Sequence, residues 1–166
     1  MPSFPSPFEP QDEEQHARSR IDRDKEALEE VRGVLKAADF YAYGRLDDQS
    51  RWCISVDDEV GRADVRIGDD GYEIELVASS PGLYADEESD WRRASRARLA
   101  RIAVSNMSKG LLESHQRAWW DETEEGVAVS ETWQLPFVRT GDIGTFIREH
   151  LAPLEALLTS LESRLD

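Results

Sequence analysis

The chain has 166 residues, 39% of them hydrophobic, which suits one folded domain with a single core and not two domains of the commonest size. Its 35 Asp and Glu against 20 Lys and Arg give a formal net charge of −15, a surplus that repels phosphate backbones and anionic lipid. Such an acidic surface serves solubility, complements a basic partner, or does both.

The first 14 residues combine four prolines with acidic side chains, a composition that opposes both helix and strand. They have neither the basic start of a signal peptide nor the apolar run of a membrane anchor. The single cysteine, Cys53, cannot form an intramolecular disulfide, so nothing points to an oxidising compartment. We therefore expect a flexible arm over residues 1–14, one domain over residues 15–166, and a cytoplasmic location.

The segment from about Glu13 to Ala38 predicts a helix, because its apolar residues recur at three- and four-residue spacing and its other faces are charged. Strand signals begin after Asp39, and apolar residues then alternate with polar ones, as in strands with one buried face. The alternating sets are Trp52, Ile54 and Val56, then Ala63, Val65 and Ile67, then Tyr72, Ile74 and Leu76. We expect a meander of at least three antiparallel strands. The predicted order of elements counts three strands here.

A second helix is predicted over residues 88–106, with two apolar sides that indicate two neighbours. One side carries Trp91, Leu99 and Ile102, and the other carries Ala97, Ala100 and Val104. Residues 111–121 and 127–135 then predict a hairpin around an acidic turn. The last segment has leucines at helical spacing up to Leu165, and Pro153 is expected to kink or divide that helix.

The resulting order is α-β-β-β-α-β-β-α, an α+β fold with a five-stranded sheet. Two features of the sequence carry a family resemblance: Leu28 to Ala38 followed by Phe40 and Tyr41, and the stretch IAVSNMSKGLLESHQRAWWDETEEGVAVSETWQLPF that ends at Phe137. With them, residues 27–165 resemble the YbjN family of bacterial proteins. The proline-rich arm lies outside the resemblance.

That resemblance implies a curved antiparallel sheet packed by helices, similar in fold to type III secretion chaperones. It also implies a protomer that usually forms a homodimer, has no cofactor and binds protein clients. Secretion chaperones of similar shape are commonly acidic and offer apolar grooves to extended client segments.

Residues that often carry chemistry are scattered along the chain. His16, His115 and His150 fall in different predicted elements and lack metal-site spacing. The alternation places Cys53 on the face opposite the core-facing residues, which would expose its thiol, but a nucleophile also needs an ordered base. We therefore expect no catalytic residue, cofactor or metal ion, and no enzyme. A small carboxylate-dependent hydrolase stays open as an alternative, and it would need a pocket of converging acids with strongly shifted pKa values.

The one basic stretch is residues 91–109, whose arginines invite a hypothesis of direct nucleic-acid binding. At about 100° per residue these arginines scatter around the helix, so ion pairs with neighbouring carboxylates are the better interpretation. Arg98 differs, because it is nearly in line with Trp91 and Ile102 and suits an interface.

Adjacent Trp119 and Trp120 must point to opposite faces of their strand, and a tryptophan on an uncovered face is a natural binding anchor. The candidate partner-binding residues are Trp91, Arg98, Trp119 and Trp133. We expect a chaperone-like adaptor or regulator, homodimeric and without a membrane contact. Its partner is expected to be a basic or extended protein, with a nucleic-acid-binding protein as one suitable class.

Overall fold

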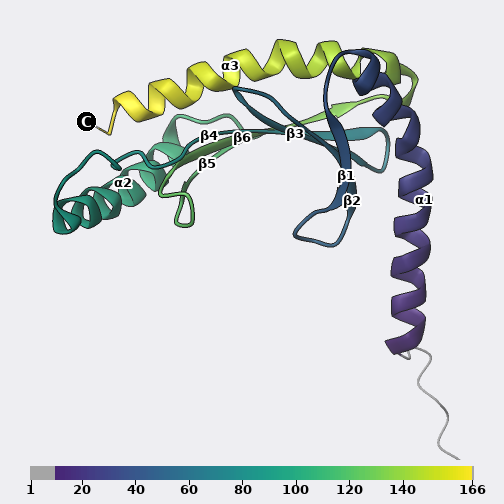
Figure 1. Cartoon of the computed structure of the whole chain (residues 1–166), viewed down its shortest axis with the longest axis horizontal. Helices are drawn as coiled ribbons and strands as arrows, with labels where there is room; N and C mark the ends of the chain where they lie inside the picture. The colour runs from purple at the N-terminus through teal and green to yellow at the C-terminus, as the bar shows by residue number, and fades with distance from the viewer. Residues whose placement is uncertain (1–9, 166) are drawn as a thin grey trace, which may run out of the picture.

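A computed structural model describes residues 10–165, in which one six-stranded antiparallel sheet carries three α-helices (Figure 1). The expected α+β class is therefore confirmed. In space the strands follow the order β1-β2-β3-β4-β6-β5, so the last hairpin joins the first four strands through β6. In chain order the elements are α1 (Pro10–Ala37), β1 (Ala42–Leu46), β2 (Trp52–Asp57), β3 (Gly61–Ile67), β4 (Tyr72–Ser80), α2 (Asp90–Gly110), β5 (Gln116–Asp121), β6 (Gly126–Leu135), a 3-10 helix η1 (Phe137–Asp142) and α3 (Ile143–Ser163).

The number of strands differs from the prediction, because residues 42–46, just after the aromatic pair Phe40 and Tyr41, form a separate edge strand. A turn over residues 47–51 reverses the chain between β1 and β2. The Asp47 carboxylate fixes this turn by accepting hydrogen bonds from the backbone N–H groups of Gln49 and Arg51, both at 2.9 Å. Asp and Asn side chains are suited to such turns. The expected five strands are thus six.

All three helices lie on the same face of the sheet. Helix α3 runs along that face over β4 and β6, whereas α1 covers β1 to β3 at one end and α2 covers β5 at the other (Figure 1). The alternation of the strands explains this, because every second side chain points into one core. That core combines Leu28, Val31 and Leu35 of α1, Ile147, Leu151, Leu154 and Leu158 of α3, and Ile54, Val65, Ile74, Leu76 and Val129 of the sheet.

Helix α1 begins at Pro10, three residues before the expected start, so residues 10–14 belong to a helix and not to the expected arm. The remainder of that predicted arm, residues 1–9, lies outside the described residues. The fully buried positions of α1 begin at Leu28, and Figure 1 shows the N-terminal half of the helix projecting beyond the sheet.

Two boundaries in the second half of the chain also differ. Strand β5 begins at Gln116, five residues later than predicted. Helix α3 continues through Pro153, so of the two predicted effects the division of this helix is wrong and the kink stays a prediction. The missing N–H of a proline removes one helical hydrogen bond. The leucines at 151, 154 and 158 are buried on both sides of that position and hold the two halves against the sheet. No helix within residues 10–165 has the length and apolar character needed to cross a membrane.

Candidate functional site

The helix-free face of the sheet is hollowed and polar. A hollow of about 650 Å³ follows this face across the strands, and its walls carry equal numbers of arginines and acidic residues on a chain whose net charge is −15. The lining residues are Arg45, Asp47, Asp48, Gln49, Arg51, Arg62, Asp64, Arg66, Glu73, Glu75, Val77, Arg117, Trp119, Ser130 and Thr132. We call this feature the polar hollow.

Asp64 is the centre of an ion-pair network in the polar hollow. Its side chain is fully buried, and Oδ2 accepts a hydrogen bond from Arg45 Nη2 at 2.9 Å, while Oδ1 accepts one from Ser55 Oγ at 2.6 Å. Arg62 and Arg66 also lie near Oδ2, at 3.3 and 3.7 Å. A carboxylate this deeply buried is stable as an ion only when its charge is compensated, and three guanidinium groups supply that compensation.

Arg66 extends the network toward the turn between β1 and β2. Its Nε donates a hydrogen bond to Asp47 Oδ2 at 2.6 Å, and its Nη2 lies 3.7 Å from Glu75. Burial by itself would raise the pKa of Asp47, but hydrogen bonds from the backbone of Arg51, the guanidinium of Arg66 and the backbone of Gln49 lower it below its ordinary value of 3.8. Asp47 is therefore ionised at neutral pH.

This chemistry fits structural ion pairing better than proton transfer. The hydrogen bonds from the Arg51 backbone and the Arg66 guanidinium lower the pKa of Asp47, so this carboxylate is not placed to act as a general acid near neutral pH. Burial raises the pKa of the Cys53 thiol, which is buried in β2 and contacts Ser55 at 3.6 Å, so the exposure considered for this cysteine is not found. In residues 10–165 no three His, Cys, Asp or Glu side chains gather in a way that could hold a metal ion.

The β5 end of the polar hollow is built differently. Arg117 and Trp119 of β5 lie there beside Ser130 and Thr132 of β6, and the Arg117 guanidinium is 5.7 Å from the centre of the Trp119 ring. Arg117 forms no ion pair with any residue between 10 and 165. Trp120, the next residue, is buried on the helix side and stacks on Tyr84. The predicted opposition of the two tryptophans is thus confirmed.

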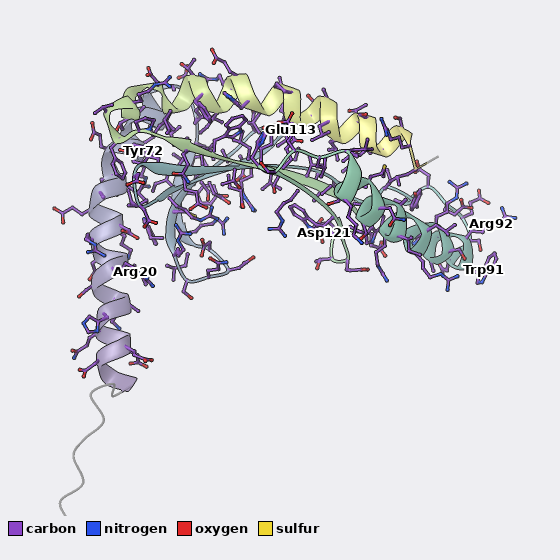
Figure 2. All side chains as sticks on the ribbon, turned by 180° about the vertical axis from the view of Figure 1, so that it is seen from behind. Arg20, Tyr72, Trp91, Arg92, Glu113 and Asp121 are labelled. Carbon is purple, nitrogen blue, oxygen red and sulfur yellow. The ribbon has the colours of Figure 1, made fainter. Side chains whose placement is uncertain are left out.

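A second surface is the side of α2 that faces away from the sheet. Three large apolar side chains are exposed there: Trp91 at 77%, Leu99 at 66% and Ile102 at 55%. The opposite side of the helix buries Ala100 and Val104 against the core. Figure 2 shows the side chains of Trp91 and Arg92 pointing outward at the end of the molecule farthest from α1. We call this surface, formed by Trp91, Ser95, Arg98, Leu99 and Ile102, the α2 outer face. Two neighbours were expected for this helix. Within residues 10–165 only its inner side, with Ala100 and Val104, packs against other elements.

The arginines of α2 divide into two groups. Arg93, Arg96 and Arg101 lie close to the carboxylates of Asp90, Glu87 and Glu122, as the ion-pair interpretation predicts. Arg92 and Arg98 have no such partner among the described residues. Both of these unpaired guanidinium groups are exposed, and Arg98 belongs to the α2 outer face.

Trp133 lies on the helix side of the sheet, under α3. Its ring packs against His115, Phe146 and His150, and its Nε1 donates a hydrogen bond to the buried carboxylate of Glu131 at 3.1 Å. The four predicted partner-binding residues therefore do not form one surface. Trp91 and Arg98 share the α2 outer face, Trp119 lines the polar hollow, and Trp133 packs in the helix layer.

The polar hollow was not predicted from the sequence. A usable signal existed, because Arg62, Asp64 and Arg66 alternate along one strand. Alternation by itself indicates a solvated face for such residues, whereas Asp64 and Arg66 are buried. Comparisons of this chain with protein-family models, with curated proteins and with solved structures found no match.

Proposed function

We propose that this protein is a non-enzymatic, chaperone-like protein-binding module that acts as an adaptor or regulator. The observation that carries the proposal is the α2 outer face. Trp91, Leu99 and Ile102 are three large apolar side chains exposed on one side of a single helix. Large apolar side chains exposed along one side of a helix, with polar neighbours, are typical of surfaces that bind another polypeptide. Tryptophan is among the residues that most often anchor such contacts.

The charge around the stripe indicates what the contacting segment carries. The net charge of the chain is −15 although residues 91–109 contribute +6, so the rest of the chain carries −21. Arg92 and Arg98 are exposed and unpaired among the described residues. A segment with apolar side chains flanked by acidic residues would complement this surface. The acidic remainder would attract a basic protein, such as a nucleic-acid-binding one, as the second partner that an adaptor joins.

The proposal includes a homodimer, in keeping with the resemblance to the YbjN family and to secretion chaperones. Two α2 outer faces would repel each other in a dimer contact, because each α2 carries arginines and no acidic residue after Asp90. Another surface would therefore join the protomers and leave both outer faces free. Light scattering is expected to give about twice the 18.9 kDa mass of the chain. A monomer at all concentrations would remove the dimer from the proposal.

A capture experiment tests the binding function. Tagged wild-type chain is compared with the double variant Trp91→Ala, Ile102→Ser, and with Val138→Ser as a matched control that removes an apolar side chain, 93% exposed, from η1. A genuine partner is retained by the wild type and by Val138→Ser and is lost with the double variant. Calorimetry with the purified partner is expected to show that the double variant binds at least about tenfold more weakly than the wild type. A loss of this size corresponds to the removal of one anchor side chain.

Two outcomes would contradict the proposal. Equal capture by all three proteins would show that the α2 outer face is not the docking surface. A DNA duplex shift that persists at moderate salt and disappears in Arg92→Gln, Arg98→Gln would replace protein binding by direct nucleic-acid binding through residues 91–109. Three of the five arginines in this helix are already close to carboxylates, which reduces the charge left for phosphates.

A further inference from the structure

The two ends of the polar hollow differ in how their charges are matched. Over β1 to β4, ion pairs join Arg45 and Arg66 to Asp64 and Arg51 to Glu73. At the β5 end, Arg117 is exposed and has no ion pair with a described residue, and its guanidinium lies over the Trp119 ring. The β5 end therefore presents a positive charge that the described part of the chain does not neutralise.

The strand register places a second arginine opposite Arg117. Arg117 pairs with Ser130 of β6, Ser130 with Val77 of β4, and Val77 with Arg62 of β3. These four side chains form one row on the hollowed face, with the two arginines at its ends. Arg62 Nε lies 3.3 Å from Asp64 Oδ2, yet it is buried without a hydrogen bond. An anion above Val77 and Ser130 would thus lie between two guanidinium groups.

The floor of this row offers an unused hydroxyl group. Ser130 is 97% buried, with a relative exposure of 3%, and it lines the hollow. Thr132 lies two residues further along β6, on the same face. Neither the Ser130 hydroxyl nor the Thr132 hydroxyl forms a hydrogen bond with residues 10–165. The Ser130 hydroxyl lines a solvent-connected hollow and has no partner among residues 10–165, so it is free to donate a hydrogen bond to a ligand atom.

Apolar surface adjoins the same place. Trp119 is half-buried and follows Arg117 by two positions, so both point to the hollowed face. Val77 lies in the floor between the two arginines. A planar side chain would pack on the indole ring while an adjacent carboxylate reached Arg117 and Ser130.

We propose that the β5 end of the polar hollow binds an extended segment of a partner protein in which an acidic residue adjoins an aromatic one. The hollow is lined by residues from the turn between β1 and β2 as far as β5, and this extent across the sheet suits a peptide better than an enclosed small molecule. Polyanions are disfavoured because the chain carries a net charge of −15. This site lies on another face of the molecule from the α2 outer face and does not depend on it.

The test follows the indole N–H signal of Trp119 by NMR, assigned with Trp119→Phe, while the peptide acetyl-Ser-Phe-Glu-Phe-Ser-amide is added. The Trp119 signal is expected to shift with a Kd near or below about 1 mM, as suits a short flexible peptide. The peptide with Gln in place of Glu is expected to bind roughly tenfold more weakly, because it loses a charge-assisted hydrogen bond.

Protein variants separate this site from its surroundings. Arg117→Gln is expected to weaken binding by about tenfold, and Ser130→Ala supplies a second variant with a smaller loss. Asp48→Asn, at the opposite end of the same hollow, is the matched control and should leave the Kd unchanged. Amide spectra of each variant confirm that the fold is retained.

Several results would overturn the assignment. It fails if no Trp119 shift occurs up to about 5 mM peptide, a range that includes even weak binding. Equal binding of the Glu and Gln peptides, or an unchanged Kd in both Arg117→Gln and Ser130→Ala, would also contradict it. A shift of Trp91 in place of Trp119 would put the peptide on the α2 outer face. Inorganic phosphate binding as tightly as the peptide would show a general anion site.

Discussion

Arg45 of β1 reaches over β2 to Asp64 of β3, where its Nη2 donates a hydrogen bond to Oδ2 at 2.9 Å. The Asp64 side chain is fully buried, and the Arg45 side chain that covers it is partly exposed. The ion pair therefore ties an edge strand to a strand two places away. The intervening strand takes part as well, because Ser55 Oγ accepts a hydrogen bond from Arg45 and donates one to Asp64.

Replacement of Asp64 tests how much this network stabilises the fold. Asp64→Asn keeps the side-chain shape but removes a buried charge that faces Arg45, Arg62 and Arg66, of which Arg66 is itself more than nine-tenths buried. The free energy of unfolding, measured by urea denaturation, is expected to fall by about 3 kcal/mol, since one member of a buried ion pair is lost.

Asp57→Asn is the matched control for that measurement. Asp57 is an exposed carboxylate on β2 that accepts a hydrogen bond from Tyr43. Its replacement is expected to cost less than about 1 kcal/mol. Equal losses for the two variants would show that the charge of Asp64 contributes no more than that of a surface carboxylate.

Asp47 predicts a specific loss of stability in acid. Its pKa in the folded protein lies below the ordinary value of 3.8 that it has in the unfolded chain. The resulting stabilisation is fully present above that unfolded pKa and is lost as the pH falls through the lower folded pKa. Asp47→Asn should therefore unfold more easily near neutral pH, with a flatter decline of stability in acid. The measurement is urea denaturation over an acid pH series, with Asp48→Asn as the control that keeps the wild-type slope.

Two glycines predict opposite responses to the same substitution. A Cβ added to Gly126, at the start of β6, would lie 1.9 Å from the backbone oxygen of Ser80, so Gly126→Ala must displace β4. We expect a loss of about 2 kcal/mol or more. Gly33 in α1 has no atom within 4 Å of such a Cβ, so Gly33→Ala should add about 0.5–1 kcal/mol of stability. Thermal unfolding measures both changes, and shifts in the same direction would contradict the structure.

The sequence predicted those features that depend on local periodicity. Alternation in the strands assigned Ile54, Val65 and Ile74 to the core, and they are fully or almost fully buried. Helical spacing identified the two sides of α2, one packed on the sheet and one open. These patterns act within one element, so a single sequence is enough to reveal them.

Features that depend on neighbouring strands could not be predicted in the same way. Arg45 and Asp64 are 19 positions apart, and their contact follows from the register of three strands. The pairing of β4 with β6 brings Arg117 into the same hollow as Arg62, which the chain order does not indicate. The continuity of α3 through Pro153 is also a tertiary effect, because packing on the sheet outweighs the lost hydrogen bond.

The most direct test of the binding function is site-specific photocrosslinking in the host cell. A photoreactive phenylalanine analogue replaces Ser95, which is four residues after Trp91 and seven before Ile102 on the α2 outer face. The same analogue at Glu149, exposed on α3, is the control. A discrete cross-linked polypeptide is predicted at position 95, absent at position 149 and abolished by Trp91→Ala, Ile102→Ser. No cross-link at position 95, or equal cross-links at both positions, would contradict the proposed function.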